Sequence, residues 1–281
     1  MSTFLIHLAV LVGVAVVAPA ALGGPRHRWW AAAGLLAVSF ALPTSRWTAL
    51  LTAPLLALSV GSSLVRARLM WTDRGRTMRA SNAVIDAITS GCAVVSAVAL
   101  AHSRAGVELG GIGEPIVELT GVHFLFAGVG ALTLARRTRP AARHHWPAVR
   151  AAAITCTACA PPLVACGFVR RLAMAQVGGA VVMSVGVCLT AALHLHEARS
   201  LSRSRDRLLL AISGMAVWVP MVFAVAWAAA QYWDVPAFSV AVMVPAHGLP
   251  NAIAFILCGL AVRRPELGQT RPSDHRALVT A

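Results

Sequence analysis

Two histidines lie inside apolar stretches that are long enough to cross a membrane, and they are the side chains of this chain best suited to chemistry. His123 falls within the stretch 114–124 and His247 within the stretch 245–251. A neutral imidazole can bind a metal, move a proton or hydrogen-bond a ligand near physiological pH. Ionisable groups in hydrocarbon usually persist where they face a partner, a cavity or a ligand. The two histidines therefore predict a polar site inside the membrane.

The composition predicts an integral membrane protein. Of 281 residues, 58% are hydrophobic and 12% are charged, and the mean hydropathy is +0.73. Short polar clusters separate nine apolar segments, so we expect an all-α bundle of about nine transmembrane helices. These segments cover residues 3–22, 29–44, 47–65, 82–101, 114–135, 149–169, 172–193, 208–230 and 236–262. We expect one polytopic transmembrane domain over residues 1–265, and a disordered cytoplasmic tail over residues 266–281.

The basic residues indicate the orientation of the chain. All 24 are arginines, which together with the many alanines points to coding bias, so the isoelectric point of about 11.5 does not predict a nucleic-acid partner. Twenty arginines fall in the tail or near the segment ends on one side of the expected bundle, and four (Arg46, Arg104, Arg170 and Arg171) fall on the other. Positive residues favour the cytoplasm, so we expect the N-terminus outside and the C-terminus inside.

The two histidines are expected at the same depth. In this topology both helices run inward, and each histidine lies about ten residues below the start of its helix, or about 15 Å into a layer of about 30 Å. Asn251 follows His247 by four residues and shares its helix face. If the fifth and ninth helices are neighbours, these side chains form one midplane pocket.

Three polar residues near His123 complete the candidate set. Thr120 precedes His123 by three residues and shares its face. Glu118 precedes it by five, about 140° around a regular helix, and aligns better with Glu114 on a face that leads toward the outer surface. We therefore place Glu118 and Glu114 nearer the outer entrance of the pocket.

Two prolines flank the second histidine. Pro245 and Pro250 lack an N–H and should leave the carbonyls of Ala241 and Ala246 without their usual helical donors. Such carbonyls are tolerated at this depth where protein, water or a ligand satisfies them. This irregularity strengthens the prediction of a site around His247. The alternative is that neutral histidines only hydrogen-bond between helices.

Both histidine segments resemble a known family. Residues 116–128 resemble the "LTAVHFHYAG" signature of the YndJ-like bacterial membrane proteins, and residues 243–255, with His247-Gly248 and Asn251-Ala252, resemble the later "HGxxNA" segment of that family. The resemblance implies a multispanning protein of the bacterial plasma membrane, and it implies no activity. The family pattern has a second histidine two residues after the first, where this chain has Leu125.

Three classes of function fit these observations. The pocket could bind a small or amphipathic ligand for transport or sensing, for which broken membrane helices are a common device. It could instead hold a metal or perform acid–base chemistry on a lipid-like substrate, although the sequence has no HExxH or comparable spacing. In the third class the chain is a membrane assembly protein whose histidines join helices. The lipid bilayer is the expected partner; the sequence identifies no cofactor, metal, catalytic residue or protein partner.

The arginine distribution generates a direct test of the orientation. A cytoplasmic reporter fused to the C-terminus should be active, and alkaline phosphatase fused at the same place should be inactive, because phosphatase folds on the outer side. Fusions after residue 105, in the loop that contains Glu108, should give the opposite pattern and serve as the control. An active C-terminal phosphatase fusion would show that the orientation is reversed.

Overall fold

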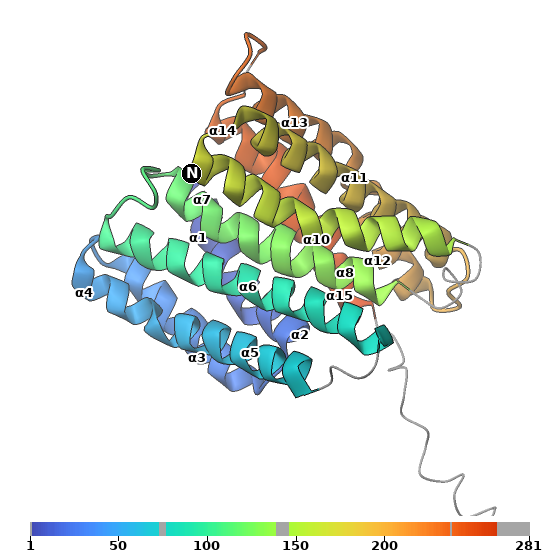
Figure 1. The fold of residues 1–281 in the computed structure, drawn as a ribbon, viewed down its shortest axis with the longest axis horizontal. Coiled ribbons are helices and arrows are strands. Elements are labelled where there is room, and N and C mark those ends of the chain that lie inside the picture. Colours follow the sequence, from blue (N-terminus) through green and yellow to red (C-terminus); the bar gives the residue numbers. More distant parts are fainter. Residues whose placement is uncertain (1, 73–76, 139–145, 237, 263–281) are drawn as a thin grey trace, which may run out of the picture.

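The computed structural model of this chain describes residues 2–72, 77–138, 146–236 and 238–262, and this part is a bundle of roughly parallel helical rods (Figure 1). Within these residues there is no β-strand, apart from one isolated bridge between Leu109 and Ile112. The predicted tail, 266–281, lies outside the described residues.

Several rods change helix type along their length. The first rod is α1 (Ser2–Val12), the π-helical η1 (Gly13–Val17) and α2 (Ala18–Leu22); the second is α3 (Arg26–Ala41); the third is α4 (Arg46–Ala49), the 3₁₀-helical η2 (Leu50–Thr52) and α5 (Ala53–Thr72). The fourth is α6 (Thr77–Ala105), and the fifth is α7 (Ile116–His123), π-helical η3 (Phe124–Ala131) and α8 (Leu132–Arg137). The sixth is α10 (Pro147–Arg170), the seventh α11 (Ala173–Ala198) and the eighth α12 (Ser204–Met215) with α13 (Trp218–Ala230). The ninth is α14 (Val240–Met243), π-helical η4 (Val244–Gly248) and η5 (Pro250–Leu257), and α15 (Cys258–Ala261).

Eight of these rods are long and apolar enough to cross a membrane. The exception is α3, the predicted second span, which has 16 residues and is therefore about 24 Å long, short of the hydrocarbon thickness of about 30 Å. It packs along the first and third rods, and Ser45 caps the next helix by accepting a hydrogen bond from the Thr48 N–H. A short turn therefore joins the second and third rods.

Arginines hold the rods together at one end of the bundle. Arg137 donates from Nη2 to the carbonyl of Ala20 at 2.6 Å, and Arg66 donates from Nη2 to the carbonyl of Leu22 at 2.9 Å. Both carbonyls belong to the last turn of the first rod. The last carbonyls of a helix lack helical N–H donors and carry a partial negative charge, so they attract arginine side chains. The C-terminal parts of the first, third and fifth rods therefore lie together at one end of the bundle.

A single buried arginine joins the rods at the opposite end. Arg104, near the end of α6, donates from Nη2 to the carbonyls of Ser39 and Leu42, both at 2.7 Å. The carbonyl of Arg104 accepts from the Ser45 N–H at 2.9 Å and from the Thr48 hydroxyl at 3.2 Å. One residue thus caps the end of α3 and fixes the start of α4.

Glycines bring the π-helical segments into contact in the core. A Cβ at Gly13 in η1 would lie 2.4 Å from Leu125 Cδ2 in η3, and a Cβ at Gly130 in η3 would lie 2.9 Å from Ile256 Cγ2 in η5. Lipid offers helices no hydrophobic drive to associate, so close packing through small residues is what holds them. The first, fifth and ninth rods therefore meet at the centre of the bundle.

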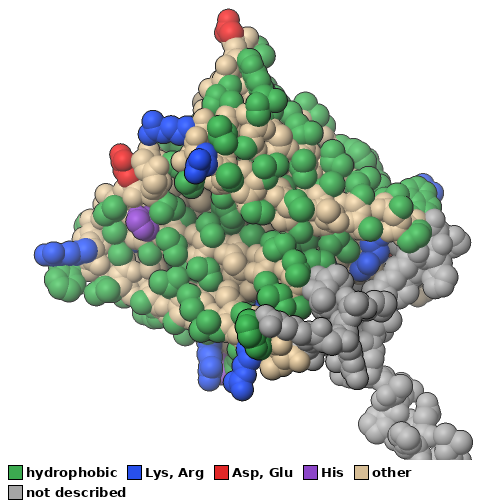
Figure 2. Space-filling model, in the orientation of Figure 1, with side chains coloured by type: hydrophobic (Ala, Val, Ile, Leu, Met, Phe, Trp, Pro, Cys, Tyr) green, Lys and Arg blue, Asp and Glu red, His purple; other side chains and the backbone are tan. Residues whose placement is uncertain are grey.

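The surface fits an apolar solvent. Figure 2 shows a face covered mainly by hydrophobic side chains, with charged side chains toward its edges. Large hydrophobic residues such as Val169, Met174 and Val222 are exposed. In water a surface of this kind would aggregate, whereas in a bilayer it contacts acyl chains.

The longest paired contact joins α10 and α11, and it depends on three glycines in one antiparallel register. A Cβ at Gly186 would lie 2.7 Å from the backbone nitrogen of Thr157, one at Gly179 would lie 3.0 Å from that of Val164, and one at Gly167 would lie 2.7 Å from that of Gln176. These neighbours are backbone atoms, so the two helices can relieve the overlap only by moving apart.

The Gly186→Val variant should therefore lower the stability of the protein, by about 1–3 kcal/mol as expected for overpacking. The matched control is Gly178→Val in the same helix, because no atom lies within 4 Å of a Cβ at Gly178. Thermal unfolding in detergent, followed by size-exclusion chromatography, measures both variants. Equal loss of stability in the two variants would show that helix propensity, rather than the α10–α11 contact, sets the effect.

Candidate functional site

The two histidines from distant segments face each other. The ring centroids of His123, at the end of α7, and His247, in η4, lie 6.1 Å apart and the rings are nearly parallel, with an interplanar angle of 18°. The fifth and ninth rods touch through η3 and η5. The structure thus brings together two of the side chains that the sequence analysis placed in one pocket.

Main-chain hydrogen bonds fix the orientation of both rings. His123 Nδ1 lies 2.9 Å from the carbonyl of Leu119, and His247 Nδ1 lies 2.7 Å from the carbonyl of Pro220 in α13. A carbonyl oxygen can only accept, so each Nδ1 carries the proton and donates it. In the neutral ring this leaves a lone pair on each Nε2, and neither Nε2 has a hydrogen-bond partner among the described residues.

Asn251 lies beside this pair. Its Nδ2 donates to the carbonyl of His247 at 2.8 Å and lies 3.3 Å from His247 Nδ1. Because His247 Nδ1 already donates to Pro220, the bond to the His247 carbonyl is the one that orients the amide. Asn251 Oδ1 is then buried without a donor among the described residues. Asn251 therefore supports the irregular backbone around His247 and adds a third acceptor that is not used.

The two rings differ in exposure. His123 is exposed and His247 is half-buried behind it. The pair thus lies at the surface of the described bundle rather than enclosed in its core.

No hydrogen bond or ion pair joins the remaining predicted residues to the histidine pair in the part of the chain that the structure describes. Thr120 donates from its hydroxyl to the Ile116 carbonyl of its own helix at 2.8 Å, and Glu114 is exposed before α7 begins. Glu118 is buried, and its Oε1 lies 3.0 Å from Nε2 of His7 in α1. Among the described residues, Glu118 thus contacts His7, and no hydrogen bond or ion pair joins it to His123.

Sequence reasoning overlooked His7. It lies within the first apolar segment, and the cost of an ionisable group in hydrocarbon singles it out in the same way as His123 and His247. Its ring stacks on Phe40 at the end of α3, with centroids 3.9 Å apart. Within the described residues, the His7–Glu118 contact is therefore a further polar cluster, separate from the predicted one.

Leu125 does not face the histidine pair. It is 2% exposed and packs against Gly13 in the central core. Two residues rotate a helix by about 200°, so positions 123 and 125 point to nearly opposite sides. The second histidine of the family pattern would therefore lie in the core contact between η1 and η3, and its replacement by Leu125 does not remove a ligand from the pair.

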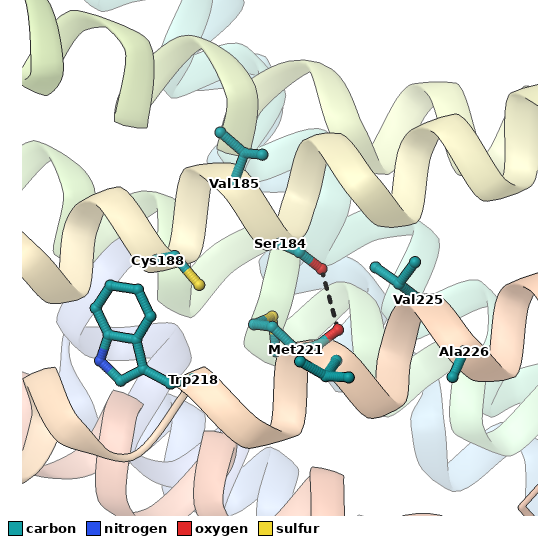
Figure 3. A pocket seen from close by; sticks show the side chains of 8 residues that line it. Ser184, Val185, Cys188, Trp218, Met221, Val225 and Ala226 are labelled. Atoms are coloured by element: carbon teal, nitrogen blue, oxygen red, sulfur yellow. Dashed lines mark hydrogen bonds between the residues drawn. The ribbon is translucent and has the colours of Figure 1, made fainter.

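An apolar groove of about 570 Å³ lies between α11 and α13, apart from both polar clusters (Figure 3). Ser184 Oγ lies 3.5 Å from the carbonyl of Met221 across it, while the hydroxyl donates to the Ala180 carbonyl of its own helix at 2.8 Å. Its other lining residues are almost all apolar, and include Val185, Cys188, Trp218, Val222, Val225 and Ala226. None of the predicted site residues lines this groove. Its composition suits hydrocarbon chains rather than polar chemistry.

The described residues contain no group of three or more His, Cys, Asp or Glu side chains with the geometry of a metal site. The histidine pair has two nitrogen donors and one amide nearby. Structural and catalytic zinc sites use three or four protein ligands. The arrangement is therefore better suited to hydrogen bonding than to holding a metal with protein ligands alone.

Comparison with known proteins places the chain in a family. The family model described as YndJ-like protein matches residues 7–255, which include both polar clusters. No curated protein and no solved structure matches the chain. The match covers most of the sequence and agrees with an all-helical protein whose helices can span a membrane. This chain therefore belongs to the YndJ-like family.

Proposed function

We propose that this protein binds a small or amphipathic ligand inside the membrane at His123 and His247, for transport or sensing. The observation that carries the proposal is the pair of nearly parallel rings, each held by an Nδ1–H bond to a main-chain carbonyl, with both Nε2 atoms unused. An unused polar atom in hydrocarbon is costly, so a ligand or water must cover the exposed ring.

The chemistry of the unused atoms indicates the class of ligand. In the neutral rings, both Nε2 atoms are acceptors, and Asn251 Oδ1 beside them is an acceptor as well. The ligand should therefore present hydrogen-bond donors, such as hydroxyl or amine groups, rather than a carboxylate or a phosphate. An apolar remainder would stay in contact with the surrounding lipid or the apolar walls of the bundle.

The structure also offers a way to separate ligand binding from a purely structural role. His247 bonds to another rod, through Pro220 of α13, whereas His123 bonds within its own helix. Hydrogen bonds between membrane helices contribute about 0.6 kcal/mol on average. If the histidines only join helices, His247 should matter for stability and His123 should hardly matter at all.

We therefore expect His123→Phe to leave the thermal stability of the ligand-free protein nearly unchanged but to abolish ligand retention. Phenylalanine keeps an aromatic ring against His247 and removes Nε2. Native mass spectrometry of the full-length protein, purified in a mild detergent, should detect a bound molecule in the wild type and lose it in this variant.

The matched control is His102→Phe. His102 Nδ1 also bonds a main-chain carbonyl, that of Glu108, at 3.2 Å, but at the end of α6 rather than in the pair. This control should retain the bound molecule. Retention in His123→Phe, or equal loss in both variants, would contradict a ligand site at the pair.

A further inference from the structure

A second polar cluster lies near the end of the bundle where Arg104 caps α3. Its members come from four rods: His7 from α1, Phe40 from α3, Arg104 from α6 and Glu118 from α7. His7 stacks on Phe40, and the Arg104 guanidinium lies 5.5 Å from the centre of the same ring. Glu118 and Arg104 are 7% and 6% exposed. The bundle therefore gathers a buried carboxyl group, a buried guanidinium and a half-buried imidazole in one place.

The polar atoms of this cluster are not fully paired. Glu118 Oε1 lies 3.0 Å from His7 Nε2, but the two are not aligned as a hydrogen bond, and Oε1 is buried without a hydrogen-bond donor. Arg104 uses Nη2 on the α3 carbonyls, while its buried Nε has no acceptor. Buried polar atoms without partners are costly, and they are often kept where a proton, a water or a ligand completes the site.

We propose that His7 and Glu118 form a proton-binding site that takes up and releases one proton. With the proton bound, the pair is a carboxylic acid beside a neutral imidazole, because an ion pair in this poorly hydrated place would pay the desolvation of two charges. When the proton leaves to water, a carboxylate remains beside a neutral imidazole. No other bond is made or broken.

Arg104 sets the number of protons that the site exchanges. It interacts electrostatically with His7, with Glu118 and with the exposed Glu114. After the proton leaves, the negative charge of Glu118 faces the positive charge of Arg104. A second proton would instead place an imidazolium and a guanidinium around a neutral acid, and like charges in a poorly hydrated site repel strongly. The site therefore alternates between one proton and none.

The position of the cluster gives the proton a route. His7 lies in the second turn of α1, and Glu118 is one turn below Glu114, which is exposed at the bundle end. The proton therefore exchanges with water on this side of the membrane, which is the outer side in the topology expected from the arginines. The α1 helix also packs against η4, which carries His247, so the site is built on an element that contacts the histidine pair.

Infrared titration of the full-length protein in lipid tests this proposal. In the wild type, the C=O stretching band of a protonated carboxyl group buried from water should weaken as the pH rises. In Glu118→Gln, this pH-dependent decrease should be absent. The other carboxyl groups are the same in both proteins, so the difference between the two titrations isolates Glu118. The control is Glu108→Gln, at an exposed glutamate, which should keep the band.

The His7→Phe variant tests whether the two residues act as a pair. Phenylalanine preserves the stacking on Phe40 and removes the proton acceptor, so the midpoint of the carboxyl titration should shift. An unchanged midpoint would show that Glu118 titrates alone and would overturn the proposal, as would a titrating band that survives in Glu118→Gln. If Glu118→Gln does not fold, the comparison of the carboxyl titration midpoints of the wild type and His7→Phe is sufficient to test the proposal.

Discussion

The absence of water in the bilayer core is the constraint on which this structure depends. Every carbonyl that loses its helical donor, and every charge that enters the bundle, must find a partner within the protein. Arg104 shows the consequence most clearly, because its guanidinium satisfies two carbonyls at the end of α3 while its own carbonyl receives two donors from the start of the next rod. The short α3 is held between its neighbours by bonds of this kind.

The same constraint explains why the glycines and the π-helical segments occur together. A π-helical turn shifts its hydrogen bonds to the fifth residue, so it absorbs one extra residue in a helix and locally redirects the side chains. In the first, fifth and ninth rods these turns lie where Gly13 and Gly130 allow close approach. Helices that associate through packing alone need such close approach, since lipid supplies no hydrophobic drive.

The helices were predictable because the signal for them is local. Apolar runs and the arginines between them locate eight spans, and the length of α3 is the main departure. The proximity of His123 and His247 could be anticipated from equal depth, but only on the condition that their rods are neighbours. That condition is set by the packing of η3 against η5, which involves residues far apart in sequence.

The partner of Glu118 could not be predicted for the same reason. Its position about 140° around the helix from His123 indicated that it faces another direction. The identity of the residue on that side depends on which rod packs there, and this is α1 with His7. The cost of an ionisable residue in hydrocarbon is enough to single out His7 from the sequence. It does not identify the residue that His7 contacts.

The location of the two histidines in the fifth and ninth rods connects the fold with the proposed site. His123 is the last residue of α7 before η3 begins, and His247 lies within η4, so each histidine is next to or inside a π-helical segment. Such changes are frequent at functional sites because they turn side chains and carbonyls away from a regular helix. In this chain Leu125 packs in the core, while His123, two residues earlier, is exposed beside His247. The irregular backbone that lets the rods pack closely thus also carries both imidazoles of the pair.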